Sequence, residues 1–170
     1  RQGFCYRLLG SEKTALKYHL KAKELGRNDA WINSEIGICY KDLDKYEEAL
    51  EYYLLAYEED KEEIWLLSDI GWLYNELDRY EEALEFLLEA EKLGRDDSWI
   101  NAEIGQCLGR LEKYDEGIER LKKALELLEK DKRRNNTGEK IFINSEIGWL
   151  IGRKDDSCLL YTSPSPRDGL

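Results

Sequence analysis

Apolar and small residues recur along the chain at the spacing of a helix. One stretch contains Ile32, Ile36, Cys39 and Tyr40, and a second runs from 46 to 56. Intervals of three and four residues place side chains on one face of an α-helix. The segment LDK (43–45) between the two stretches predicts a tight turn, and neither stretch contains proline. The pattern therefore predicts two amphipathic helices that fold back on each other as a hairpin.

This hairpin pattern is repeated with a period of thirty-four residues. Its first halves are WINSEIGICY (31–40), WLLSDIGWLY (65–74), WINAEIGQCL (99–108) and FINSEIGWLI (142–151). Its second halves are KYEEALEYYLLA (45–56), RYEEALEFLLEA (79–90) and KYDEGIERLKKA (113–124), and GFCYRLLGSEKTALKYHLKA (3–22) fits the same frame. Such a period is typical of a stacked array whose units bury their apolar faces against their neighbours.

Signals for helix ends lie between the units. Gly26 and Gly94 are expected to take the left-handed conformation that ends a helix, and Asp29 and Asp97 to cap the next one. Nine extra residues before Phe142 predict a longer second helix and a loop at 135–138. We expect units of about 1–29 (truncated), 30–63, 64–97, 98–139 (with the insertion) and 140–157 (first helix only).

The repeated unit resembles the tetratricopeptide repeat over nearly all of residues 1–157. The matching positions in one unit are Ile36, Gly37, Tyr40, Ala49, Tyr53 and Ala56, and in the next Ile70, Gly71, Tyr74, Ala83, Leu87 and Ala90. Asn33 and Asn101 stand where the family has tryptophan. The resemblance implies an all-α fold, a right-handed α-α superhelical solenoid of helical hairpins.

Small residues are expected where two helices of such a hairpin cross closely, because larger side chains would hold the backbones apart. The expected packing positions are Gly37, Gly71, Gly105, Gly148, Ala49, Ala83, Ala56 and Ala90.

Aromatic residues recur at one place in the first helices. These are Trp31, Trp65, Trp99 and Phe142, while Trp72 and Trp149 follow Trp65 and Phe142 by seven residues, or about two helical turns. In the resembled family this helix lines a concave groove that binds peptides. The resemblance thus implies a partner-binding groove formed by these six aromatic residues with Glu35, Asp69 and Glu103, favouring apolar or basic segments. Alternatively, the tryptophans fill the space between successive repeats.

Three of the four cysteines are interpreted as structural, and the fourth, Cys158, lies in the last thirteen residues. Cys5, Cys39 and Cys107 share one place in their units, where Leu73 stands in another, which indicates buried packing. Reduced thiols suit a cytoplasmic protein.

His19 is the only histidine and takes the place that Tyr53 holds in the next unit, so it is interpreted as a packing residue. A catalytic array would need His19 and Cys5 to act as base and nucleophile. The sequence has no glycine-rich phosphate loop and no ligand cluster with metal spacing. We therefore predict no enzymatic activity, no catalytic residues, no cofactor and no metal.

Charge narrows the choice of partner. The chain of 170 residues has a net charge of −11 and a pI near 4.8. An acidic surface repels phosphate, so nucleic acid is not expected as a partner, and the lack of a long apolar run gives no expectation of membrane binding. The prediction is a cytoplasmic scaffold that binds a protein or peptide. The alternative is a peptide-sensing or regulatory array attached to an effector domain outside this sequence.

Both ends of the sequence differ from the repeats. It begins RQG without methionine, so we expect the true amino terminus, with any targeting segment, to be missing. CLLYTSPSPRD (158–168) resembles the in-frame translation of adapter DNA used in preparing sequencing libraries. We therefore expect 158–170 to be a non-native tail on a fragment of a bacterial protein.

Overall fold

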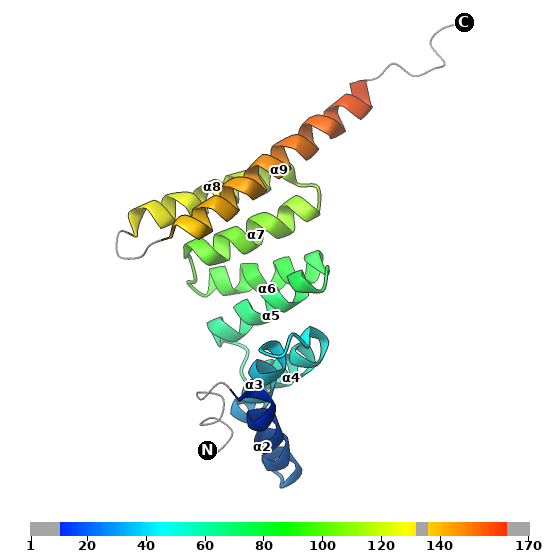
Figure 1. Cartoon of the computed structure of the whole chain (residues 1–170), viewed down its shortest axis with the longest axis vertical. Helices are drawn as coiled ribbons and strands as arrows, with labels where there is room; N and C mark the ends of the chain where they lie inside the picture. Colours follow the sequence, from blue (N-terminus) through cyan, green and yellow to red (C-terminus); the bar gives the residue numbers. More distant parts are fainter. Residues whose placement is uncertain (1–10, 132–135, 163–170) are drawn as a thin grey trace, which may run out of the picture. The chain divides into compact units, whose positions relative to one another are not determined.

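The computed structural model describes residues 11–131 and 136–162, with 157–162 described as backbone only. All regular secondary structure in these residues is α-helical (Figure 1), which confirms the all-α prediction. The chain divides into two compact units, 1–95 and 96–170.

Unit 1 contains five helices within its described residues. They are α2 (Glu12–Glu24), α3 (Ala30–Lys41), α4 (Tyr46–Glu59), α5 (Ile64–Glu76) and α6 (Tyr80–Lys92). Helix α3 packs on α4 and α5 packs on α6 as two hairpins, while α2 lies against α3 and α4 against α5. Helices α3, α4 and α5 therefore each contact a helix outside their own hairpin.

Unit 2 contains α7 (Ser98–Arg110), α8 (Tyr114–Lys130) and α9 (Thr137–Thr162). Helix α7 packs on α8, α8 packs on α9, and α7 also touches α9. One core cluster of this unit contains Ala102, Leu121, Ala124, Leu128, Ile143 and Leu150. The hairpins of the two units begin at Ala30, Ile64 and Ser98, at the thirty-four-residue period of the sequence.

The turn inside each hairpin depends on one residue with left-handed backbone conformation. Asp44, Asp78 and Glu112 have φ of 57°, 58° and 61°. After Asp44, the amide of Lys45 donates to the carbonyl of Tyr40 over 3.0 Å, which closes the end of α3. The tight turn predicted for LDK is confirmed.

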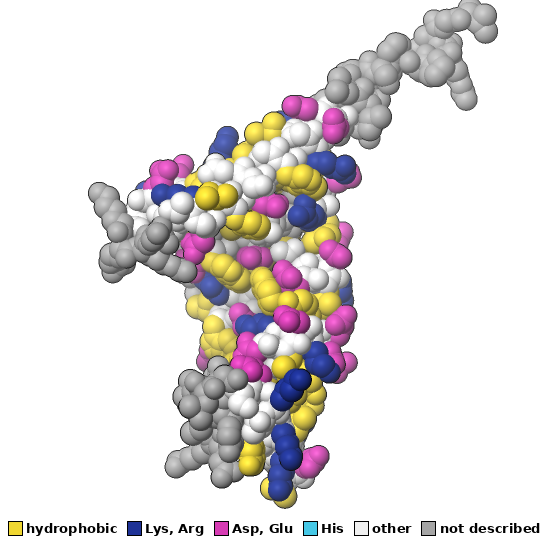
Figure 2. Space-filling view, in the orientation of Figure 1, with side chains coloured by type: hydrophobic (Ala, Val, Ile, Leu, Met, Phe, Trp, Pro, Cys, Tyr) yellow, Lys and Arg dark blue, Asp and Glu magenta, His cyan; other side chains and the backbone are white. Residues whose placement is uncertain are grey.

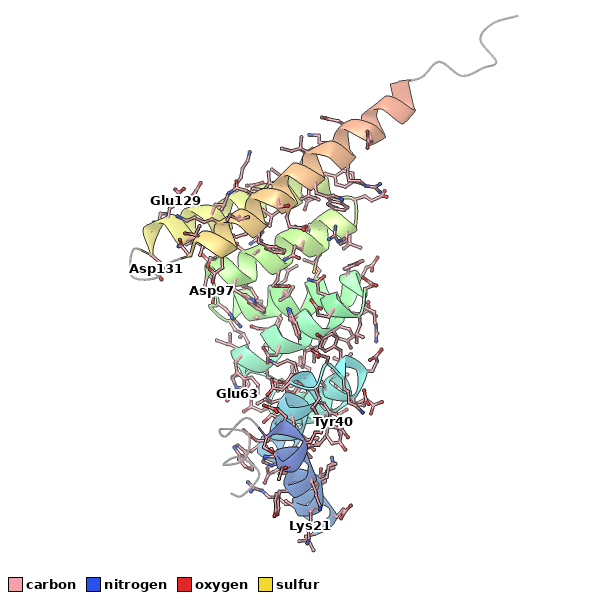
Figure 3. All side chains as sticks on the ribbon, viewed as in Figure 1. Lys21, Tyr40, Glu63, Asp97, Glu129 and Asp131 are labelled. Carbon is pink, nitrogen blue, oxygen red and sulfur yellow. The ribbon has the colours of Figure 1, made fainter. Side chains whose placement is uncertain are left out.

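The predicted helix-end signals between successive repeats are confirmed. Gly26 and Gly94 have φ of 95° and 107°. The Asp29 side chain accepts a hydrogen bond from the amide of Ile32 over 2.8 Å, and Asp97, labelled in Figure 3, accepts one from the amide of Ile100 over 2.9 Å. These bonds satisfy amides that the first turn of a helix leaves without a helical partner.

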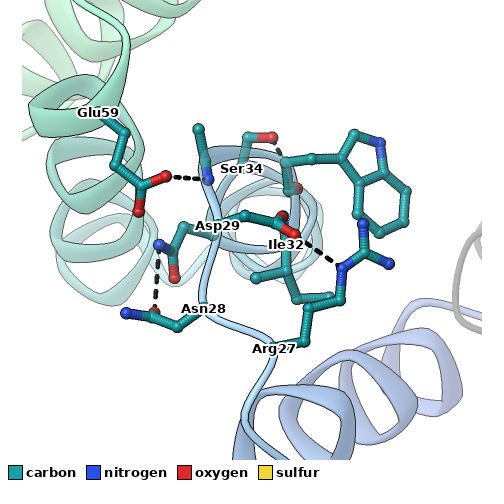
Figure 4. Close-up of polar contacts among 9 residues, drawn as sticks. Arg27, Asn28, Asp29, Ile32, Ser34 and Glu59 are labelled. Atoms are coloured by element: carbon teal, nitrogen blue, oxygen red, sulfur yellow. Dashed lines mark hydrogen bonds and ion pairs between the residues drawn. The ribbon is translucent and has the colours of Figure 1, made fainter.

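Two further residues strengthen the start of α3 (Figure 4). Arg27 Nε donates to Asp29 over 2.9 Å, and Glu59 at the end of α4 accepts from the amide of Ala30 over 2.7 Å. The hydrogen bond from Arg27, followed by that from the Ile32 amide, lowers the pKa of Asp29. The carboxylate therefore remains charged near the positive end of the helix dipole.

Glycines in the first helices allow the two helices of a hairpin to approach closely. A Cβ placed on Gly71 would lie 2.7 Å from Cγ of Leu87, and one on Gly105 would lie 2.8 Å from Cγ of Leu121. Gly37 meets the ring of Tyr53 in the same way. Ala49, Ala83, Ala56 and Ala90 are fully buried. Real Cβ atoms do not approach other atoms as closely as they would at Gly37, Gly71 and Gly105. A larger residue at any of these three glycines would therefore force the facing side chain or helix to shift.

Gly148 does not make the close packing expected for it. It is exposed, and a Cβ placed there would meet none of the described residues within 4 Å. The other three glycines each face a second helix, whereas no described helix follows α9.

The insertion is partly as predicted. Helix α8 has 17 residues against 13 in α6, so the longer second helix is present. The loop prediction is wrong for Thr137 and Gly138, which belong to the first turn of α9. Arg134 and Asn135 lie outside the described residues.

Helix α9 is longer than the predicted first helix. It was expected to end by 157 but continues to Thr162, and in Figure 1 it extends past the ends of α7 and α8. Lys154 stands where the other turns have an apolar residue such as Leu111, so the turn signal is absent.

We predict opposite effects of the same substitution at two glycines of unit 2. Gly105→Ala should lower the free energy of unfolding by about 1–3 kcal/mol, because the new methyl group meets Leu121 and the carbonyl oxygen of Gly117, 3.0 Å away. Gly148→Ala should be neutral or raise it by up to about 1 kcal/mol, since alanine favours the helix and space is open. Urea unfolding followed by circular dichroism tests both. Equal effects at the two positions would contradict the close crossing of α7 and α8.

Candidate partner-binding site

Trp31 and Trp65 are the second residues of the equivalent helices α3 and α5, and each contacts the helix that precedes its own in the chain. The Trp31 ring lies edge-on to His19 in α2 with 5.8 Å between centroids, and the Trp65 ring lies edge-on to Tyr53 in α4 with 6.2 Å. These contacts support the packing interpretation of the two tryptophans. The side chains nevertheless remain 39% and 42% exposed, so each presents part of its ring to solvent.

Trp72 extends this arrangement along α5. Its ring lies edge-on to Tyr46 of α4 at 5.4 Å, two helical turns from the contact between Trp65 and Tyr53. Tyr46 and Tyr53 are themselves seven residues apart on α4. The four side chains therefore form two aromatic pairs along the α4 and α5 contact, which we call the aromatic ladder.

Asp69 lies between Trp65 and Trp72 in sequence, and its carboxylate is paired with a cation within unit 1. Its Oδ2 accepts hydrogen bonds from Lys41 Nζ and, over 3.2 Å, from the hydroxyl of Tyr53. Lys41 Nζ also lies 5.9 Å from the centroid of the Trp72 ring. The Asp69 carboxylate on α5 thus bonds to Lys41 on α3 and to Tyr53 on α4.

Glu35 and Glu103, predicted to line the groove, are buried. They are 6% and 8% exposed, so they present little surface to a ligand, and their place in a groove stays a prediction. Nε2 of His19, itself buried, lies 3.6 Å from Oε2 of Glu35. First helices such as α3 contact neighbours on several sides, and every residue from 32 to 37 is buried. Acidic residues at these positions therefore face protein rather than solvent.

In unit 2 the aromatic candidates lie on α7 and α9. Trp99 is half-buried, whereas Phe142 and Trp149 are 49% and 42% exposed. The guanidinium of Arg110 lies 4.2 Å from the centre of the Trp149 ring, and its Nη2 is 3.7 Å from Oε2 of Glu146. Trp149 is thus covered on one side by a cation.

The structural role of Asn33 and Asn101 is not evident from the sequence. Both are buried and act as acceptors, Asn33 from Lys23 Nζ over 2.7 Å and Asn101 from Arg120 over 3.3 Å. Asn101 also donates to Asp96 over 2.8 Å. These bonds satisfy polar groups at the place where the family has tryptophan. The hydrogen bond from Lys123, followed by that from Asn101, lowers the pKa of Asp96.

The two cysteines whose side chains the structure describes lie in the core. Cys39 and Cys107 are fully buried and form no disulfide, and burial, followed by the charge of Glu103, raises the pKa of Cys107 to about 12. Cys5, and with it the pairing considered with His19, lies outside the described residues. No cluster of three potential metal ligands occurs in the part of the chain described. None of the described helices has the length and apolarity needed to span a membrane.

On the face shown in Figure 2, hydrophobic side chains lie among acidic and basic ones rather than in one continuous apolar area. The largest exposed apolar side chains of unit 1, beyond the two tryptophans, are Leu25, Leu55 and Leu88. Leu55 and Leu88 belong to the second helices α4 and α6, whereas the tryptophans belong to first helices.

Comparison with known proteins identifies the repeats. The family model of the tetratricopeptide repeat matches residues 28–96. No curated protein matches the sequence significantly. Among solved structures, MamA (41-end) from Desulfovibrio magneticus RS-1 has a TM-score of 0.78 at 22% identity, covering 91% of this chain and 82% of that one. PilF of Pseudomonas aeruginosa has a TM-score of 0.67 at 23% identity, covering 91% and 67%.

Residues 28–96 are therefore tetratricopeptide repeats, and the chain as a whole has the fold of tetratricopeptide repeat proteins. The predicted resemblance is confirmed. Arrays of this kind form scaffolds for interactions between proteins, on the extended surfaces that stacked repeats create.

We predict that Cys39 and Cys107 do not react with thiol reagents in the folded protein. In a Cys5→Ser/Cys158→Ser variant, labelling by an aromatic disulfide at pH 8 should be slower than for free cysteine by roughly a hundredfold or more, because a buried thiol forms little thiolate. Both thiols should react at once in urea, which serves as the control. Rapid labelling of either thiol without urea would contradict the packing interpretation.

Proposed function

We propose that the chain is a scaffold that binds an extended apolar or basic segment of a partner protein, with the exposed edges of Trp65 and Trp72 at the centre of the site. The observation that carries the proposal is the 42% exposure of Trp65 on a helix that is otherwise largely buried. Tryptophan is enriched among the residues that dominate binding energy at protein interfaces. We also propose a cytoplasmic location, where the thiols of Cys39 and Cys107 stay reduced.

The aromatic ladder supports this site because its side chains are already held in place. Trp65 is held against Tyr53 and Trp72 against Tyr46, and the ion pair of Asp69 with Lys41 lies beside them. A partner that contacts rigid rings loses little additional side-chain entropy on binding. The site thus offers preorganised apolar area within a charged surface.

The charge of unit 1 favours a basic partner. Residues 42–91 contain eighteen Asp and Glu but only three Lys and Arg. Many of these carboxylates are exposed on the second helices and adjoining turns, including Glu47, Glu51, Glu81 and Glu85. Because Glu35 is buried and Asp69 is paired, the attraction comes from this wider acidic surface, and it raises the association rate more than the final affinity.

We expect peptides that bind the chain to combine Lys or Arg with apolar residues. An array of 15-residue peptides that vary in net charge and apolar content should show this preference. Trp65→Ala and Trp72→Ala should each weaken the selected peptides by at least about tenfold, the effect of losing a central aromatic contact. Leu88→Ala, which removes an apolar side chain of similar exposure from the second helix α6, should leave binding unchanged.

Melting temperatures of all variants separate binding from folding, and Trp65→Leu provides a variant that keeps an apolar contact with Tyr53. Selected peptides without basic residues would contradict the charge preference. If Trp72→Ala changed neither the melting temperature nor the affinity, the assignment of Trp72 to the site would be wrong.

A further inference from the structure

Trp72 and Trp149 hold the same place in α5 and α9, but the residues four positions later carry opposite charges. Glu76 follows Trp72, and Arg153 follows Trp149. Residues four positions apart are neighbours on one face of a helix. The two tryptophans therefore allow a comparison of the same ring beside a carboxylate and beside a guanidinium.

The Trp149 ring is contacted by two guanidinium groups of the chain itself. Cζ of Arg153 lies 5.8 Å from the ring centroid, and Cζ of Arg110 on α7 lies 4.2 Å from it. Indole rings attract cations because the face of the ring is electrostatically negative. Unit 2 thus shows that a tryptophan at this place in a first helix is contacted by arginine.

The cation that unit 1 supplies to Trp72 is more distant. Lys41 Nζ, which bonds to Asp69, lies 5.9 Å from the Trp72 centroid. An arginine of the same unit comes closer to an indole, since Cζ of Arg27 lies 4.3 Å from the centroid of Trp31. Planar guanidinium groups stack on aromatic rings, whereas an ammonium group is more strongly hydrated. Within the described part of unit 1, Trp72 therefore lacks the close guanidinium that Trp31 has.

Carboxylates lie around Trp72 and its partner ring, Tyr46. The Tyr46 hydroxyl donates to Asp44 over 3.3 Å, and the Trp72 ring lies edge-on to Tyr46 with 5.4 Å between centroids. Partial burial raises the pKa of Tyr46, and the charges of Asp44 and then Glu76 raise it further, so both carboxylates act on this ring. Asp44 and Glu76 are exposed, and Glu76 forms no ion pair with any residue that the structure describes. We call Asp44, Tyr46, Trp72 and Glu76 the Trp72 site.

A tryptophan followed by an acidic residue at these two places occurs in α5 and in none of the other described first helices. The equivalents of Trp72 and Glu76 are Ile38 and Asp42 in α3, Gln106 and Arg110 in α7, and Trp149 and Arg153 in α9. Where the tryptophan recurs, the chain supplies an arginine, and where the acid recurs, the ring is absent. The Trp72 site thus has the ring and the carboxylates but no arginine of its own.

We propose that the Trp72 site binds an arginine side chain of the partner protein, with the guanidinium against the Trp72 ring and its N–H groups directed at Asp44 and Glu76. This inference rests on the function proposed above and adds the place where a basic residue of the partner is bound. Arginine suits the site better than lysine, because a planar guanidinium stacks on a ring and donates several hydrogen bonds to carboxylates at once. One bound arginine would also fix the register of the partner segment along the array.

The probe for the site is N-acetylarginine N-methylamide, which carries one positive charge and no carboxylate. Its binding to the full chain is followed by NMR of the tryptophan indole N–H groups at constant ionic strength. We expect a saturable shift of the Trp72 signal. The lysine analogue should bind at least about twofold more weakly. The citrulline analogue, which has the shape of arginine without its charge, should give no saturable shift.

Variants at Glu76 provide a matched set. Glu76→Gln removes the charge and should weaken probe binding about two- to fivefold, the effect of one partly exposed ion pair. Glu76→Arg reproduces the arrangement at Trp149, so the chain's own guanidinium should contact the ring and reduce probe binding at least about tenfold. Glu85→Gln makes the same change in net charge at an exposed carboxylate of α6 and should leave binding unchanged. Circular dichroism verifies that each variant is folded.

Absence of a saturable Trp72 shift in the wild-type chain would overturn the inference, as would equal losses for Glu76→Gln and Glu85→Gln. Tighter binding of the lysine analogue would overturn the preference for arginine. None of these results contradicts the proposed function, which is tested by peptide binding to Trp65→Ala and Trp72→Ala.

The array peptides extend the test to a bound segment. A peptide that binds should lose at least about fivefold in affinity when the arginine at the Trp72 site is replaced by citrulline. Peptides that require Trp65 and Trp72 but tolerate citrulline at every arginine would overturn the inference and leave the proposed function standing. A probe that shifts the Trp72 signal while no array peptide binds would support the site and contradict the proposed function.

Discussion

The close crossing of two helices at a glycine is the constraint on which each hairpin depends. At Gly71 and Gly105 the facing side chain and backbone leave no room for a Cβ, and at Gly37 the ring of Tyr53 occupies that space. The crossing fixes the position of the second helix along the first. Tyr53 is then in reach of Asp69, and Leu121 joins the core of unit 2 with Ala124 and Leu128. A local restriction on side-chain size thus positions contacts well beyond the hairpin turn.

The same bulky position links packing within a hairpin to packing between hairpins. Tyr53 covers Gly37 of its own hairpin, contacts Trp65 of the next and donates to Asp69. Its equivalent in α2, His19, contacts Trp31. Trp31 and Trp65 are therefore structural and accessible at once, because each ring packs against the preceding helix while the residue remains 39% or 42% exposed. Packing and partner binding are not exclusive alternatives for these residues.

The period, the helix ends and the close crossings could be predicted because each depends on residue type at a local spacing. Gly26 ends the helix directly before it and Asp29 caps the helix directly after it. Gly71 is recognised because glycine recurs at its position in every repeat. The burial of Glu35 and Glu103 could not be predicted in this way, since acidic residues are exposed in most proteins and the covering residues lie elsewhere in the chain. The unit bounds predicted from the period end at 157 and do not predict that α9 continues to Thr162, where Lys154 lacks the apolar side chain that Leu111 has at the equivalent turn position.

The distribution of charge indicates that association and dissociation of a partner would depend on different side chains. Asp69 is satisfied by Lys41 and Tyr53, so its replacement would first disturb the packing of α3, α4 and α5. The exposed carboxylates of the second helices act at longer range, and salt screens them over about 8–10 Å. Apolar contact with Trp65 and Trp72 is not screened. A partner held mainly by these rings would therefore dissociate at a rate nearly independent of ionic strength, whereas its association rate would fall as salt increases.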